Sequence, residues 1–421
     1  MNIIIINQPL SNRGDEAAHK SLLRMLNKEI DNAKIKVLHV GGNQDSINQF
    51  KVKGGNNSYI NFKPYKAHGY CIKKGFKYGI THLLSLIHPT HRKVAKEIKS
   101  ADLVICSPGG ICMGPYQSWD HLWFLKLSIV YNKKIAYYGR SFGPFPTGNK
   151  SQILFKNESL KMLPKFDFLS LRDSVTQGYA KSLNLDFIST VDTALLDSPS
   201  VIVPNEISEQ IGSNYIVYVP NELKWNPKFI NIDSDLLEIY YLSILKYLLQ
   251  IKEDINIVML PQLFNYDEGS DVDYFKYLKS KITDNSRIKV INDQYSSDIQ
   301  QTIISKAEYL IGARYHSVVF SVNNKTPFTA LSYEHKISGL LKDLDLDSNM
   351  VDFSFLLEKN RLSANEKMNE NLTTIYKMLD ETISKGKRQK VKQTEARELA
   401  ETGKKHFLKL YKSIQSTCDL K

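Results

Sequence analysis

The chain begins with Met1-Asn2-Ile3-Ile4-Ile5-Ile6-Asn7, in which four isoleucines follow one another without interruption. Short continuous β-branched runs are typical of parallel strands that are covered by helices on both faces. A polar turn follows at 12–16, then a helical pattern of apolar residues over 17–30, and a second strand is predicted at 35–40. This strand–helix–strand order predicts a parallel sheet with right-handed crossovers.

The same alternation continues through the rest of the 421 residues. Further strands are predicted at 102–106, 134–139, 168–173, 187–190, 215–220, 256–260, 288–291, 308–312 and 327–331. A stretch without clear period at 196–212 separates the two halves. The sequence therefore predicts the α/β class, with two Rossmann-like doubly wound domains over 1–197 and 198–380 facing each other across a cleft, and a basic helical tail over 381–421.

The whole chain has a net charge of +12, and its positive charge is concentrated in two segments, 51–96 and 385–412. Residues 51–96 contain no acidic residue, and we expect 41–96 to form a long basic loop beside the N-terminal domain. Such segments attract anionic lipid, nucleic acid or a diphosphate-linked substrate, and a solvated surface is an equally good interpretation. No nucleic-acid-binding module accompanies them, so no nucleic acid partner is expected. The tail either lies on a membrane or packs back on the core.

The expected location is the cytoplasm, with peripheral contact at an anionic membrane surface. The N-terminal apolar run is far shorter than that of a signal peptide, and no stretch reaches the roughly 18 apolar residues of a spanning helix. The four cysteines match no zinc or redox spacing, so reduced thiols and no metal site are expected.

Two residues after the strand at 308–312 suit chemistry on an anion. Arg314 and His316 are separated by one residue, which in an extended strand end puts both side chains on one face. A guanidinium binds carboxylate or phosphate in a bidentate manner, and an imidazole transfers protons near neutral pH. An isolated Arg-x-His is more often structural than catalytic, so the interpretation depends on the surrounding residues.

Those surroundings resemble the signature region of the polysaccharide pyruvyl transferase family. The matching positions are Gly312, Arg314, His316, Ser317, Pro327, Tyr333, Lys336, Gly339 and Leu344. Other family-like motifs follow in the expected order: Asn12-x-Gly14-Asp15-Glu16-Ala17, Gly109-Gly110, Gly143-Pro144, Ser170-x-Arg172-Asp173, Asp192 and Pro261-Gln262. An ordered set of motifs over about 3–346 is far more specific than any one of them.

The resemblance implies a GT-B-like fold and a ketal-forming, phosphoenolpyruvate-dependent activity. The family transfers the enolpyruvyl carbons of phosphoenolpyruvate onto two hydroxyls of a sugar in a bacterial surface or exopolysaccharide and releases phosphate. By resemblance, Arg172 and Arg314 match family arginines that contact the donor, one from each domain. Lys336 is a further candidate for donor binding, and the chemistry of the imidazole makes His316 the expected general acid within the donor site. Phosphoenolpyruvate is the co-substrate, no further cofactor or metal is expected, and the acceptor is expected to be lipid-diphosphate-linked or nucleotide-linked.

Candidate acceptor-binding residues lie in the N-terminal domain: Asn12, Asp15, Glu16, Gly109, Gly110 and Arg140. For Asn12, Asp15 and Glu16, capping of the following helix explains the residues equally well. Asp192 ends a strand, where pairing with a cation and local capping are both open. Arg140 stands where family members often carry glutamine, so the resemblance says less about the acceptor than about the donor.

Two other functions compete with pyruvyl transfer. One is a nucleotide-sugar-dependent glycosyltransferase with the same GT-B fold, because fold alone does not decide the reaction. The other is a non-catalytic polysaccharide-binding protein, which would be expected to have lost one of Arg172, Arg314 and His316. The chain retains all three.

Overall fold

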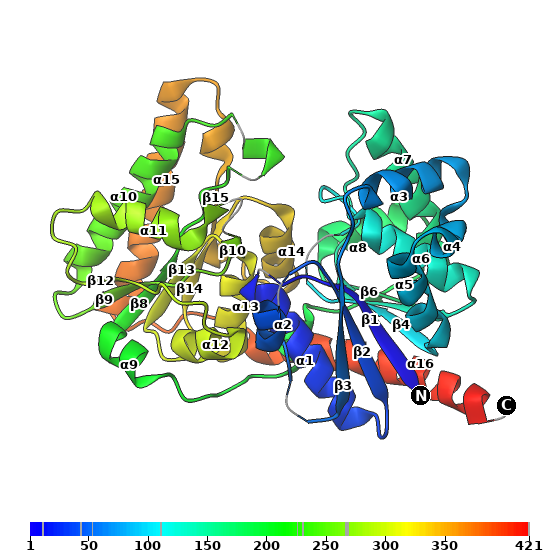
Figure 1. Ribbon diagram of the computed structural model, residues 1–421. Coiled ribbons are helices and arrows are strands. Elements are labelled where there is room, and N and C mark those ends of the chain that lie inside the picture. The colour runs from blue at the N-terminus through cyan, green and yellow to red at the C-terminus, as the bar shows by residue number, and fades with distance from the viewer. Residues whose placement is uncertain are drawn as a thin grey trace. The chain divides into compact units, whose positions relative to one another are not determined.

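The computed structural model describes residues 1–10, 12–42, 44–52, 54–109, 112–224, 226–229, 231–265 and 269–419. The chain divides into two compact units (Figure 1). The first unit comprises Met1–Leu10, Asp15–Asp197 and Arg397–Lys421, and the second comprises Ser11–Gly14 and Ser198–Ala396. Neither unit is therefore a single continuous segment of the sequence.

The first unit is built on a parallel sheet that has seven strands in the described residues, in the order β3-β2-β1-β4-β5-β6-β7. Its strands are β1 (Asn2–Gln8), β2 (Lys34–Val40), β3 (Asn56–Phe62), β4 (Leu103–Cys106), β5 (Lys134–Arg140), β6 (Phe168–Leu171) and β7 (Ile188–Ser189). Its helices are α1 (Arg13–Glu29), α2 (Gln44–Gln49), α3 (His68–Tyr78), α4 (Leu84–Ile87), α5 (Pro89–Ser100), α6 (Trp119–Val130), α7 (Lys150–Met162), α8 (Ser174–Ser182) and α16 (Gln393–Asp419).

The isoleucine run of β1 separates two cores, one on each face of this sheet. Ile4 and Ile6 face a core that includes residues of α3, α5, α6 and α7. Ile3 and Ile5 face a second core with residues of α1 and α16. Successive side chains of a strand point to opposite faces, so an unbroken apolar run is what a doubly covered strand requires. The predicted doubly wound sheet is confirmed.

The segment 41–96 is not the loop that the sequence predicted. It contains α2, the edge strand β3, which pairs in parallel with β2, and the short helices α3 to α5. His68 links these elements, since its Nδ1 lies 2.7 Å from Nε2 of His91 and its Nε2 is paired with the Asp120 carboxylate. The Gly, Asn and Lys content of the segment led to the prediction of a loop, although α5 buries His91, Val94, Ala95 and Ile98 at helical spacing.

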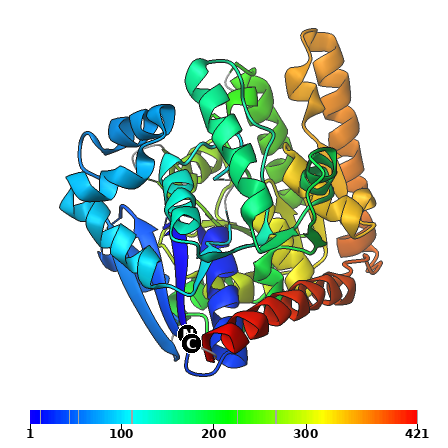
Figure 2. The same ribbon diagram turned by 90° about the vertical axis from the view of Figure 1, so that its right-hand side faces the viewer.

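The C-terminal helix α16 packs on the first unit's sheet. Phe407 stacks on Tyr138 with ring centroids 5.2 Å apart, and Tyr411 and Ile414 join the same core. Lys404 lies 3.4 Å from Glu29 of α1, and Figure 2 shows α1 and α16 side by side. Of the two interpretations of the tail, packing against the core is the one the structure has.

The second unit repeats the architecture with a parallel sheet, six-stranded in the described residues, in the order β12-β9-β8-β13-β14-β15. Its strands are β8 (Tyr215–Val219), β9 (Asn256–Met259), β12 (Ile288–Val290), β13 (Tyr309–Gly312), β14 (Phe328–Ser332) and β15 (Met350–Asp352), with a small hairpin of β10 (Phe264–Asn265) and β11 (Gly269–Ser270). Its helices are α9 (Asn205–Ile211), α10 (Ser234–Ile251), α11 (Asp271–Ser280), α12 (Ser297–Ser305), α13 (Tyr315–Asn324), α14 (His335–Asp343) and α15 (Arg361–Leu379). The predicted α/β class is confirmed for both units.

Candidate active site

Arg314 and His316 lie at the turn from β13 into α13, at the carboxyl end of a central strand of the second unit. The prediction that they share one face of a strand end is wrong. The strand ends at Gly312, Arg314 is the N-cap residue of α13, and His316 is already helical. A side chain on Gly312 would overlap Ser317, whose hydroxyl donates to the carbonyl of Arg314 at 2.6 Å. The tight strand–helix turn therefore sets the direction of both functional side chains.

Arg314 is positioned by Asp271, the first residue of α11. Nη2 of Arg314 is paired with Oδ1 of Asp271, while Oδ2 accepts from the backbone N–H groups of Gln262 and Leu263, each at 2.9 Å. Burial lowers the pKa of Arg314, but the Asp271 carboxylate outweighs that effect and raises the pKa above its ordinary value. The guanidinium is therefore a fixed cation at the end of the sheet.

His316 packs on the backbone of Gly14, which belongs to the second unit. A Cβ atom on Gly14 would overlap Nδ1 and Cγ of the imidazole and stand 2.6 Å from its Cβ. The turn that carries Gly14 is held by Asn12, whose Oδ1 accepts from the Gly14 N–H at 2.7 Å. Of the two interpretations of Asn12, the structure supports helix capping.

Arg13 is a buried cation of the same unit that the sequence analysis did not single out. Its backbone N–H donates to the Gln262 carbonyl at 2.9 Å, and its Nη2 donates to Oε1 of Gln294 at 3.3 Å. Its guanidinium carbon lies 5.1 Å from the centre of the Phe264 ring. Arg13 thus packs at the end of β9, where the Gln262 amide N–H also meets Asp271.

Lys336 adds a third cation, at the start of α14. Its Nζ lies 3.0 Å from Oε1 of Glu334 and 5.9 Å from the centre of the Tyr315 ring, which places the ammonium group near the first turn of α13. Arg314, as the N-cap residue, makes no side-chain capping bond to that turn. A helix N-terminus with nearby cations is a favourable environment for a carboxylate or phosphate.

Arg172 belongs to the first unit and is only 1% exposed. Its Nη1 is paired with the Asp192 carboxylate, and its Nε donates to Oγ of Ser141 at 2.9 Å. Asp192 also accepts from the Ala194 N–H at 2.9 Å, so it both pairs with a cation and caps a short helix. These contacts hold the Arg172 side chain inside the first unit.

The structure describes several candidate acceptor residues of the first unit, and they do not all lie in the same surroundings. Asp15 lies against Gly109, where a side chain at φ +106° would overlap its carboxylate. Glu16 is buried and paired with Lys20 at 2.5 Å. Arg140 is also buried, with its guanidinium 5.2 Å from the Tyr137 ring centre.

Gly110 lies outside the described residues, so only Gly109 of the glycine pair has a described position. Among the described acceptor candidates, the structure brings Asp15 and Gly109 into contact. Glu16 and Arg140 are buried, Glu16 beside Lys20 and Arg140 beside Tyr137.

Two residues at this site escaped the sequence analysis. Arg13 occupies the variable position of the Asn12-x-Gly14 motif. Its positive charge was the one feature of the sequence that could have marked it as a candidate anion-binding residue. Asp271 follows the Pro261-Gln262 motif at the start of a helix, where a carboxylate looks like ordinary capping. Only the tertiary structure shows that Asp271 holds Arg314.

The fold is similar to that of several solved carbohydrate enzymes. UDP-GlcNAc 2-epimerase from Neisseria meningitidis matches with a TM-score of 0.57 and 11% identity, over 97% of this chain and 100% of that chain. HepE of Anabaena, solved in complex with UDP-glucose, matches with a TM-score of 0.52 and 14% identity, over 96% of this chain and 99% of that chain. At such low identity these similarities establish the fold, which is of the GT-B type, and nothing further.

Sequence comparison gives a closer relationship. The amylovoran biosynthesis protein AmsJ of Erwinia amylovora is 22% identical over 276 residues, which cover 62% of this chain and 64% of AmsJ. The chain thus spans less than two thirds of that relative's length. Residues 12–335 match the polysaccharide pyruvyl transferase family, and this match includes Asn12, Gly14, Arg172, Arg314 and His316. The chain therefore belongs to the polysaccharide pyruvyl transferase family.

Proposed function

We propose that the protein is a phosphoenolpyruvate-dependent pyruvyl transferase that forms a pyruvate ketal on a sugar of a bacterial surface polysaccharide or exopolysaccharide. The observation that carries this proposal is the junction of β13 and α13. There Arg314 is fixed by Asp271, and His316 stands two residues further along at the start of a helix. Arg13 and Lys336 add positive charge in the same unit.

The donor needs two kinds of charge recognition, because phosphoenolpyruvate carries a carboxylate and a phosphate on the same carbon. Arg314 can grip one of these groups through parallel N–H donors, and the N-terminus of α13 with Lys336 suits the other. Fixed cations of this kind also stabilise charge that develops on the departing phosphate. In this proposal the reaction needs no metal, because these side chains supply the positive charge.

His316 is the proposed general acid. It delivers a proton to the methylene carbon, C3, which becomes a methyl group, and C2 becomes an oxocarbenium-like centre. One sugar hydroxyl attacks C2, the C2–O bond to phosphate breaks, and a second hydroxyl attacks to close the ketal. The two hydroxyl protons balance the proton added to C3 and the proton taken up by phosphate.

Arg172 is proposed as a positioning residue rather than a direct donor ligand. Its bonds to Asp192 and Ser141 link β6, β5 and the segment after β7. Asp15, beside Gly109, remains the proposed acceptor-side carboxylate of the first unit. The acceptor itself is proposed to be lipid-diphosphate-linked or nucleotide-linked, and the similarity to a polysaccharide biosynthesis protein supports a polysaccharide precursor.

Peripheral contact with an anionic membrane is part of the proposal. No helix in the described part of the chain is long and apolar enough to span a membrane. Between α3 and α5, however, Leu86 and Ile87 are 68% and 73% exposed, and Ile80 and Leu83 are exposed as well, as are Tyr70 and Tyr78 on α3 itself. The surrounding charges are basic, since 51–96 lacks acidic residues. Apolar side chains within a basic surface suit the interface of an anionic bilayer.

The test is phosphate release from phosphoenolpyruvate by the purified protein in the presence of lipid-linked or nucleotide-linked sugars. The proposal predicts acceptor-dependent release that His316→Ala and Arg314→Ala abolish. Mass spectrometry of the acceptor should show the added ketal. If a UDP-sugar stabilises the protein and is consumed while phosphoenolpyruvate is not, the glycosyltransferase alternative replaces this proposal.

A further inference from the structure

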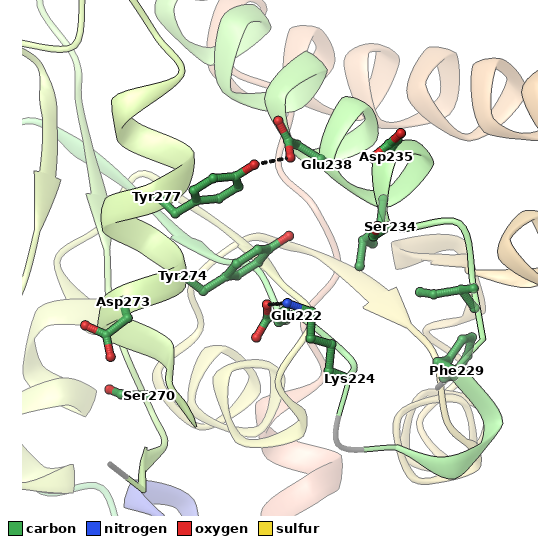
Figure 3. Close-up of a pocket in the computed structure, with 12 residues that line it drawn as sticks. Glu222, Lys224, Phe229, Ser234, Asp235, Glu238, Ser270, Asp273, Tyr274 and Tyr277 are labelled. Carbon is green, nitrogen blue, oxygen red and sulfur yellow. Dashed lines mark hydrogen bonds and ion pairs between the residues drawn. The ribbon is translucent and has the colours of Figure 1, made fainter. Parts of the chain in front are cut away.

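A second feature of the second unit is a pocket of about 720 Å³ near the carboxyl ends of β8 and β9. It is lined by the segment after β8, the first turns of α10, and one face of α11 (Figure 3). Its volume falls in the range of roughly 300–1,000 Å³ that is usual for small-molecule sites. Neither Arg314 nor His316 lines it, so it is distinct from the proposed donor site.

The ionisable groups of this pocket are mostly acidic. Among the described residues, its lining includes four carboxylates, from Glu222, Asp235, Glu238 and Asp273, and one ammonium group, from Lys224. That ammonium group is itself paired with Glu222. A lining of this sign repels phosphate and carboxylate groups. The pocket is therefore unsuited to phosphoenolpyruvate or to a nucleotide diphosphate.

Aromatic side chains form its other surfaces. Tyr274 and Tyr277 stand one turn apart on α11, with ring centroids 6.4 Å apart and planes inclined by 18°. Tyr277 donates its hydroxyl to Oε2 of Glu238 at 2.6 Å, which fixes both side chains (Figure 3). Phe229 lines the pocket from the loop before α10. Burial raises the pKa of Tyr274, and Tyr241 and the carboxylates of Glu222 and Glu238 act in the same direction, so its hydroxyl remains a donor.

Carboxylates beside aromatic rings match the two faces of a sugar. The axial C–H groups of a pyranose pack against a ring face, and its hydroxyls donate to carboxylate oxygens. A neutral or amino sugar can both pack on the rings and donate to the carboxylates, whereas the carboxylates would repel an anionic ligand. We infer that this pocket is a carbohydrate subsite that binds a neutral or amino hexopyranose of the acceptor glycan, an inference that rests on the proposed function for the identity of the acceptor.

The pocket and the donor site share the N-terminus of α11. Ser270 lines the pocket and caps this helix through its Oγ, which accepts from the Val272 N–H at 3.2 Å. The next residue, Asp271, holds Arg314. In this inference, a glycan with one sugar in the pocket would extend along the N-terminus of α11 toward Asp271 and Arg314. The subsite would select the acceptor by a residue adjacent to the one that receives the ketal.

The first experiment measures binding without donor. Saturation-transfer NMR with the full chain uses methyl glycosides of glucose, galactose and glucosamine as probes. At least one should give a signal that Tyr277→Ala and Glu222→Gln each reduce at least fivefold. Lys276→Ala, on the same helix, and Glu253→Gln, at a different exposed site, are the matched controls and should retain the signal. Excess phosphoenolpyruvate should not displace the glycoside.

The inference is overturned if none of the three glycosides binds, or if the pocket variants bind as well as the controls. A second readout separates it from the proposed function. In acceptor-dependent phosphate release, the pocket variants should raise the KM for the acceptor at least fivefold and leave the KM for phosphoenolpyruvate unchanged. If phosphoenolpyruvate is never consumed but glycoside binding depends on Tyr277 and Glu222, the subsite stands and the proposed donor is wrong.

Discussion

The imidazole of His316 lies directly on the Cα atom of Gly14, so closely that any side chain at position 14 would occupy the space of the ring. The two residues come from motifs at opposite ends of the family match. The absence of a side chain at position 14 thus leaves room for the proposed general acid.

The first prediction concerns Gly14→Ala. The added methyl group should force His316 out of position and lower phosphoenolpyruvate-dependent phosphate release by at least a hundredfold. In a thermal unfolding experiment it should also lower Tm, but much less in a His316→Gly background, where both the ring and the Cβ atom of residue 316 are gone. Gly178→Ala, where a methyl group would meet nothing within 4 Å, is the control. Equal Tm losses in both backgrounds would contradict this steric account.

The second prediction concerns Arg314. Arg314→Ala leaves the Asp271 carboxylate buried without its cation, which should cost about 3–5 kcal/mol of unfolding free energy. Arg314→Lys keeps the positive charge but loses the paired N–H donors of the guanidinium, so it should raise the KM for phosphoenolpyruvate at least tenfold. Denaturant titration and steady-state kinetics measure the two effects. A Lys variant with an unchanged KM would remove Arg314 from the donor site.

The third prediction separates Arg172 from the donor-binding residues. Because Asp192 is fully buried, Arg172→Ala should destabilise the protein by about 3–5 kcal/mol. Arg172→Lys should lower the unfolding free energy while leaving the KM for phosphoenolpyruvate within about twofold of the original enzyme. If the Lys variant instead raises this KM tenfold without loss of stability, Arg172 touches the donor after all.

The fourth prediction concerns the exposed apolar side chains before α5. The protein should sediment with vesicles that contain phosphatidylglycerol and much less with vesicles of phosphatidylcholine alone. The double variant Leu86→Ser, Ile87→Ser should weaken this binding at least fivefold without a change in Tm, because both side chains are exposed. Ile202→Ser, at an exposed site elsewhere, is the control. Binding that is insensitive to Leu86 and Ile87 would exclude this surface as the contact.

The fifth prediction concerns acid stability and His39. Burial lowers the pKa of His39 from 6.5 to about 4, only partly opposed by the Gln8 carbonyl. The unfolded chain therefore binds this proton first, and stability falls as pH drops from about 6.5 toward 4. The loss between pH 7 and pH 4.5 should be about 2 kcal/mol. His39→Gln should reduce the pH dependence by that amount in denaturant titrations, and an unchanged slope would contradict the assignment.

Most strands were predictable because their signal is local, whereas β3 and β15 were not among the predicted strands. Runs such as Ile3–Ile6 need only be apolar and β-branched to indicate a doubly covered strand. The helix α5 buries His91, Val94 and Ile98 at helical spacing, but the residues on which it packs, such as Trp123 of α6, lie far along the chain. Its packing is set by tertiary contacts that no short window of sequence contains.

The position of Arg314 and His316 at the end of a strand was predictable, whereas the orientation of their side chains was not. Arg314 and His316 were identified from their motif, but the strand-face argument failed because α13 begins at once after the strand. Asp271 could not be recognised, since a buried partner of Arg314 has no sequence pattern of its own. Spacing along the chain indicates which residues matter, whereas orientation depends on the turn between elements.

The second unit includes Ser11–Gly14, a short piece from the start of the chain, together with Ser198–Ala396. A gene fragment encoding only 198–396 would lack the backbone on which His316 rests. Homologous recombination that exchanges C-terminal halves between relatives must therefore also preserve a compatible N-terminal tetrapeptide. The fold of the second unit is thus completed by residues that the start of the gene encodes.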